Sequence, residues 1–158
     1  MTMDSWNNTA LTEEDRMTLV RECLAAGHRM RYLHFRGVSM RPMLRQGLDA
    51  VELAPLPQHL KKYDLPVYQY PSGKYVMHRV VKVKNEHYVC RGDNTYQDEF
   101  VSHEQMLGVV SAFRRGKKRI EVSAPGYRLY CWLWVAIYPL RKIYFRCRNW
   151  LSRHIPHS

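Results

Sequence analysis

The sequence predicts a mainly β fold, in which a compact β domain carries an N-terminal helix and a C-terminal amphipathic helical segment. Short alternating segments broken by Pro, Gly and Asn fill the middle of the 158-residue chain. A capped stretch with helical spacing precedes them, and apolar and basic residues at helical spacing come after them. A chain of this length favours one core. We therefore expect a helical appendage at residues 1–30, a β-rich domain at 31–124 and an apolar, basic helical tail at 125–158.

The first expected element is a helix over residues 11–27. Thr12 can cap it, three acidic residues follow in the first turn, and Gly27 can end it. Its apolar stripe, which should pack on the β domain, consists of Met17, Val20 and Leu24, with Leu19 as a further candidate.

Seven strands are expected in the β domain, separated by turns at residues 70–74 and 84–86. The basic run 114–119 is expected to be a solvated hairpin tip, with contact to phosphate groups as the alternative. No aromatic residues alternate with these charges, so nucleic-acid binding is poorly supported. The expected strands are Tyr32–Arg36, Ala50–Leu53, Leu65–Tyr70, Lys74–Val83, His87–Arg91, Gly108–Arg114 and Arg119–Ser123.

The last third of the chain is apolar and then amphipathic. The apolar run 129–140 is well short of the ~20 residues that span a bilayer. Two interpretations stay open for the amphipathic segment that begins at its end: a basic helix lying on an anionic membrane, or a helix packed on the β domain or on a partner subunit. The apolar positions are Leu140, Ile143, Tyr144, Cys147, Trp150 and Leu151, and the basic ones Arg141, Lys142, Arg146, Arg148 and Arg153.

Composition narrows the class of protein. The net charge of +11 suggests attraction to an anionic surface. Four cysteines without a Cys-x-x-Cys pair favour free thiols in a reducing compartment, and the eight histidines show no metal-ligand spacing. There is no phosphate-binding glycine loop or dinucleotide fingerprint, so we expect no metal and no cofactor. The first residues do not resemble a secretory signal, which favours a cytoplasmic protein, or one peripheral to the inner membrane face.

A candidate nucleophile lies in the segment Gly37-Val38-Ser39-Met40-Arg41-Pro42-Met43-Leu44. Serine needs a base to be a nucleophile, and His78 lies downstream in a strand-like run. Asp93 and Asp98 follow and could orient the imidazole. Taken singly, each feature has a simpler explanation: a proline-fixed loop, a structural histidine, and a hairpin turn.

Taken together, these motifs resemble a known family. Gly-x-Ser-Met-x-Pro-x-Leu, then His-Arg-Val-Val, then Arg-Gly-Asp-Asn with a further Asp resembles the type I signal peptidases and their LexA-repressor relatives, over about residues 35–113. Most bacterial members use a lysine base, whereas the endoplasmic-reticulum and archaeal branch uses histidine. Such peptidases are tethered by an N-terminal membrane helix, which we do not expect here.

The resemblance implies a role for each matching residue. Ser39 would be the nucleophile, with its N–H in the oxyanion hole, and His78 the base. Asp98 would orient His78, and Asp93 would support the site structurally. The turn around the nucleophile would be shaped by Gly37, Met40 and Pro42.

A lysine base is the alternative that the strand pattern disfavours. In one regular strand Lys74 and Lys82 would share a face with His78, each about 13 Å from it at roughly 3.3 Å per residue. Neither could then occupy the position of His78.

The expected function is a serine endopeptidase that cleaves a leader or signal-like peptide through an acyl-enzyme. The substrate would add a strand beside the catalytic β elements. The alternative is a self-cleaving or peptide-binding regulatory protein on the same fold, although one helix before Arg31 is too little for a helix-turn-helix domain. The sequence leaves the oligomeric state, the cleavage site and the choice between cis and trans cleavage open.

Overall fold

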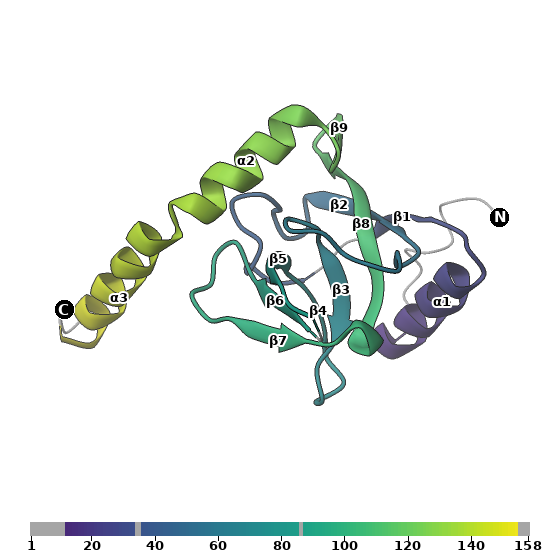
Figure 1. The fold of residues 1–158 in the computed structure, drawn as a ribbon, viewed down its shortest axis with the longest axis horizontal. Helices are drawn as coiled ribbons and strands as arrows, with labels where there is room; N and C mark the ends of the chain where they lie inside the picture. The colour runs from purple at the N-terminus through teal and green to yellow at the C-terminus, as the bar shows by residue number, and fades with distance from the viewer. Residues whose placement is uncertain (1–11, 34–35, 86, 155–158) are drawn as a thin grey trace.

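The computed structural model describes residues 12–33, 36–85 and 87–154. Within these residues the structure is mixed, with antiparallel sheets in the middle and helices at both ends (Figure 1). The helices are α1 (Glu13–Ala25), α2 (Pro125–Ala136) and α3 (Tyr138–His154), and a short 3-10 helix, η2, covers His103–Gln105. The β-rich middle agrees with expectation. Leu11, Glu86 and residues 34–35 and 155–158 of the expected elements lie outside the described residues.

Two antiparallel sheets form the β domain. The larger has the order β1-β2-β8-β3-β4, with β9 paired to β8, and the smaller has the order β5-β6-β7. The larger sheet consists of β1 (Met30–Leu33), β2 (Asp49–Ala54), β3 (Pro66–Gln69), β4 (Tyr75–Met77), β8 (Met106–Arg115) and β9 (Lys118–Glu121). The smaller consists of β5 (Arg79–Val83), β6 (Tyr88–Arg91) and β7 (Glu99–Val101).

The expected single strand Lys74–Val83 is wrong. The chain leaves the larger sheet after Met77 and enters the smaller one at Arg79, so His78 lies between β4 and β5. Lys74, His78 and Lys82 therefore do not share one strand face, contrary to expectation. Instead, the change of sheet places His78 at the junction of the two sheets.

The remaining strand predictions differ mainly at their ends. β7 was not expected at all, and β1 and β9 lie slightly earlier in the chain than predicted. The basic run 114–119 does form the exposed tip of the β8–β9 hairpin, with Gly116 at a φ of +61°. Arg119 turns back from this tip and donates to Glu52 over 2.7 Å.

Helix α1 follows its sequence signals closely. Thr12 caps it in a reciprocal capping box with Asp15, and Gly27 adopts a φ of +82° just after its end. Met17, Val20 and Leu24 are buried in the same hydrophobic cluster as the larger sheet. Leu19, at 36% exposure, does not join the stripe.

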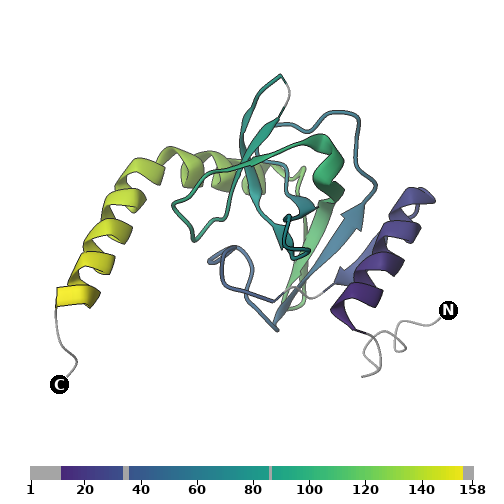
Figure 2. The same cartoon turned by 90° about the horizontal axis from the view of Figure 1, so that it is seen from below.

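The C-terminal segment is two helices rather than one. They join at Ile137, just before Pro139, which lacks the N–H needed to continue the hydrogen-bond ladder of α2. Figures 1 and 2 show the pair as a bent arm at the end of the molecule opposite α1. Among the described residues, no helix is long and apolar enough to pass through a bilayer.

Candidate active site

The loop that carries Ser39 is fixed by residues on either side of it. Gly37 has a φ of +113°, a region that side-chain-bearing residues rarely adopt. Met40, Met43 and Leu44 are buried in the core beneath the loop. Ser39 itself is partly exposed, so the anchoring residues leave it at the surface of the domain.

A second turn holds this loop from the other side. The backbone N–H of Asn94 donates to the carbonyl of Ser39 over 2.6 Å, and the Asn94 side chain donates to the carbonyl of Val38 over 3.2 Å. Gly92 lies so close that an added Cβ would be 2.8 Å from the same Ser39 carbonyl. The Gly-Asp-Asn turn, which we call the clamp, therefore holds the loop that carries Ser39.

His78 is buried and its Nδ1 faces a carboxylate. Nδ1 lies 2.9 Å from Oε2 of Glu99 and 3.1 Å from the hydroxyl of Tyr68. The hydroxyls of Tyr68 and Tyr70 both donate to Glu99, the second over 2.6 Å. Because an ionised carboxylate only accepts, this network assigns the Nδ1 proton to the bond with Glu99 and leaves Nε2 as an acceptor.

The network also sets the charge state of its members. Burial alone would raise the pKa of Glu99, but hydrogen bonds from His78, Tyr68 and Tyr70 outweigh it and hold the pKa below its ordinary value. Burial, together with the bond to Glu99, raises the pKa of both tyrosines above its ordinary value. Glu99 is thus an anion and the two hydroxyls are neutral donors near neutral pH.

Ser39, His78 and Glu99 line one cavity of about 390 Å³. Residues 36–40 form one wall, and residues 74–78, which include β4, form another. Within the described residues, which include Ser39 and His78, the structure contains no direct hydrogen bond between these two side chains. Proton transfer from Ser39 Oγ to His78 Nε2 would first require such a hydrogen bond to form.

The two predicted aspartates lie elsewhere. Asp98 is bound by Arg91, whose Nε is 2.6 Å from Oδ1. Asp93 is buried and forms an ion pair with Arg79 over 2.6 Å. The expectation that Asp98 orients His78 is therefore corrected, since the carboxylate at Nδ1 belongs to Glu99. The structural support of the site that we expect from Asp93 stays a prediction, and the ion pair with Arg79 is compatible with it.

The remaining predicted positions line the cavity or anchor its wall. Gly37, Met40 and Lys74 are among its lining residues, and Pro42 lies exposed in the turn beyond Met40. Glu99, Tyr68 and Tyr70 were missed. A weak signal existed for Glu99, because Glu99 and the buried Val101 share a strand face while Asp98 does not.

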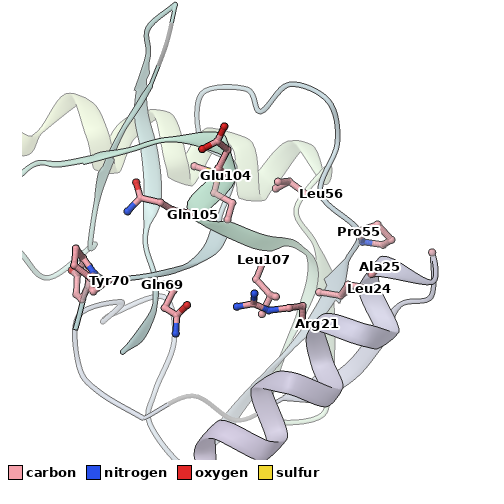
Figure 3. A pocket seen from close by; sticks show the side chains of 13 residues that line it. Arg21, Leu24, Ala25, Pro55, Leu56, Gln69, Tyr70, Glu104, Gln105 and Leu107 are labelled. Atoms are coloured by element: carbon pink, nitrogen blue, oxygen red, sulfur yellow. The ribbon is translucent and has the colours of Figure 1, made fainter. Parts of the chain in front are cut away.

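A larger cavity of about 640 Å³ lies between α1, the β3–β4 hairpin and the segment before β8. Figure 3 shows Arg21 and Leu24 of α1 on one side and Gln105 and Leu107 on the other. Tyr70 lines both cavities, but none of the predicted site residues lines this one. In the described part of the chain, no group of three or more His, Cys, Asp or Glu side chains could hold a metal ion.

No protein-family model matches this chain, and a search of curated proteins found no match.

Proposed function

We propose that this chain is a serine endopeptidase in which Ser39 is the nucleophile, His78 the base and Glu99 the group that orients the base. The observation that supports this most is the shared cavity, in which the imidazole is held through Nδ1 and Nε2 remains an acceptor. The motifs that resemble the signal peptidases and LexA-like peptidases support the same assignment, including membership of that superfamily.

The arrangement can perform acyl transfer in two steps. Ser39 Oγ attacks the scissile carbonyl and gives its proton to Nε2 of His78, while the Ser39 N–H stabilises the oxyanion. His78 then protonates the leaving amine, and water releases the acyl group with His78 acting again as base. Glu99 stabilises the imidazolium that forms in both steps. Each positioned proton transfer contributes about 10²- to 10⁴-fold.

The substrate we propose is an extended peptide, in line with a leader or signal-like precursor. In the described part of the chain, β4 pairs with β3 and otherwise ends the larger sheet. Its residues line the same cavity as the Ser39 loop. A peptide strand added along β4 would therefore present its carbonyl groups to Ser39, as in other strand-addition complexes.

A serine-reactive probe tests the nucleophile. The purified chain is treated with a fluorophosphonate, and Ser39→Ala is compared with Ser72→Ala, an exposed serine at the tip of the β3–β4 hairpin. We expect labelling of the wild type and the Ser72 variant and none of the Ser39 variant. Labelling that persists in Ser39→Ala would reject the assignment.

Cleavage of a peptide library, read by mass spectrometry, tests the base. His78→Ala should abolish cleavage, whereas Lys74→Gln, at the rim of the same cavity, should retain it. The reverse result would make a lysine the base. If instead the only Ser39-dependent cleavage is of the chain itself, the alternative of a self-cleaving regulatory protein is favoured over hydrolysis in trans.

A further inference from the structure

The arm formed by α2 and α3 carries an unusual amount of exposed apolar surface. Six large apolar side chains along it are between 47% and 70% exposed. They define what we call the outer face: Leu129, Trp132 and Leu133 of α2, and Leu140, Ile143 and Trp150 of α3. Singly scattered exposed apolar residues are normal on a protein surface, but six on one arm are more than that, and larger exposed apolar patches are typical of interaction sites.

The outer face is distinct from the face that holds the arm on the domain. Tyr127 and Cys131 of α2 and Phe145 of α3 are buried. At 100° per residue, Leu129, Trp132 and Leu133 lie on the side of α2 away from Tyr127 and Cys131, and Leu140 and Ile143 lie away from Phe145. Packing on the domain therefore accounts for one side of each helix and leaves the outer face unexplained.

The positive charge of the arm indicates which kind of partner the outer face can bind. Residues 125–154 contain six Lys and Arg and no Asp or Glu. Arg128, Lys142 and Arg146 are exposed and flank the apolar positions. A second copy of the same arm would bring like charges together, whereas an anionic bilayer offers both negative headgroups and an apolar layer.

We propose that the outer face binds the surface of an anionic phospholipid bilayer, with α2 and α3 lying in the headgroup region. Trp132 and Trp150 are suited to this depth because an indole ring places an apolar body and a polar N–H at the interface. The basic side chains at the flanks reach phosphate groups. The proposal stands on the arm alone and does not depend on the peptidase activity.

Vesicle co-sedimentation of the full chain tests it, with 1:1 phosphatidylglycerol and phosphatidylcholine compared with phosphatidylcholine alone. We expect binding at least about tenfold tighter to the anionic vesicles. A Trp132→Asn and Ile143→Asn double variant should lose binding by at least about tenfold. Leu48→Asn is the control, because Leu48 is 66% exposed and lies in a turn outside α2 and α3. It should bind like the wild type.

A second variant separates charge from apolar contact. Lys142→Gln with Arg146→Gln should weaken binding to anionic vesicles by about fivefold per charge and flatten its salt dependence. Far-UV circular dichroism and thermal unfolding confirm that every variant is folded. Failure of the wild type to bind anionic vesicles, or equal binding to both compositions, would overturn the proposal. A second result would also overturn it: a wild-type chain that does not bind vesicles but forms a dimer in sedimentation equilibrium, where the Trp132→Asn and Ile143→Asn double variant is a monomer.

Discussion

Asp98 and Glu99 are adjacent in the chain, yet their side chains have different partners. Glu99 receives hydrogen bonds from His78 and two tyrosines, whereas Asp98 is 41% exposed and pairs with Arg91. Adjacent strand positions point to opposite faces, so a shift of one residue changes the chemistry of the carboxylate. The register of β7 therefore determines which of the two carboxylates contacts His78.

We predict that Glu99→Gln lowers kcat/KM on a cleaved peptide by at least about 100-fold, because the amide can donate to Nδ1 and favour the wrong tautomer of His78. Asp98→Asn is the matched change one residue away and should alter kcat/KM by less than about threefold. Peptide hydrolysis by both variants, at equal folded protein, measures this. A larger loss in Asp98→Asn than in Glu99→Gln would contradict the assignment.

The lowered pKa of Glu99 predicts a pH dependence of stability. The group binds protons more weakly in the folded state than in the unfolded state, where its pKa has its ordinary value of about 4.5. Its stabilising contribution is therefore complete above that value and is lost as pH falls through the folded pKa. Urea unfolding between about pH 7 and pH 3 should show a shallower acid loss in Glu99→Gln than in the wild type. Parallel curves would contradict this.

At the scale of elements, the turn at residues 92–94 holds the loop that carries Ser39. We predict that Gly92→Ala lowers serine-probe labelling about tenfold or more, because the new Cβ would lie 2.8 Å from the Ser39 carbonyl. Overpacking of this kind also destabilises by about 1–3 kcal/mol. Gly126→Ala is the control, since its Cβ meets nothing within 4 Å at the start of α2. Unchanged labelling in Gly92→Ala would show that the loop is held by other contacts.

Local signals predicted α1, its Thr12 cap and most strand positions, because caps and turn residues act over a few residues. These signals could not predict that the strand ends at His78, because β-branched and apolar residues continue on both sides of it. The end of the strand is visible only in the fold, where the residues before and after His78 belong to different sheets. β7 was missed for a related reason. In β7 the apolar Phe100 is 69% exposed while the charged Glu99 faces inward. The pattern of apolar residues in the sequence is therefore the opposite of the pattern of buried residues in the strand.

The same limit applies to the site. Ser39, His78 and their shared cavity could be anticipated because the motifs are short and ordered. The carboxylate and tyrosines around Nδ1 gave a weak signal at most, since they come from β3, the residue after it and β7, which meet only in the folded chain. Long-range contacts thus decided the part of the site that sequence patterns left ambiguous.

At the scale of the whole molecule, one hydrophobic cluster joins side chains from α1, the larger sheet and α2. Hydrogen bonds to the turn that contains Asp93 and Asn94 connect the arm to the loop that carries Ser39. Trp134 donates to the carbonyl of Asp93 over 3.1 Å, and Arg141 donates to the same carbonyl. The neighbouring Asn94 holds Ser39. Hydrogen bonds therefore join the arm, the clamp and the Ser39 loop.

Arg79 is buried and connects Asp93 of the clamp to Tyr127 of the arm. It binds Asp93 through two nitrogens, at 2.8 and 2.6 Å, and donates to the Tyr127 hydroxyl over 2.9 Å. Burial alone would lower the pKa of Arg79, but Asp93 raises it well above its ordinary value, so the guanidinium stays charged. Only 1% and 2% of the Arg79 and Asp93 side chains are exposed.

We predict that Asp93→Ala destabilises the fold by about 3–5 kcal/mol, because it leaves the Arg79 charge buried without its partner. Arg79→Met with Asp93→Leu should recover most of that loss, since an apolar pair of similar size removes the unpaired charge. Urea unfolding of both variants measures the difference. If Asp93→Ala kept wild-type stability and instead changed the pH profile of cleavage, Asp93 would act in the reaction. The ion pair would then not be what holds the arm to the clamp.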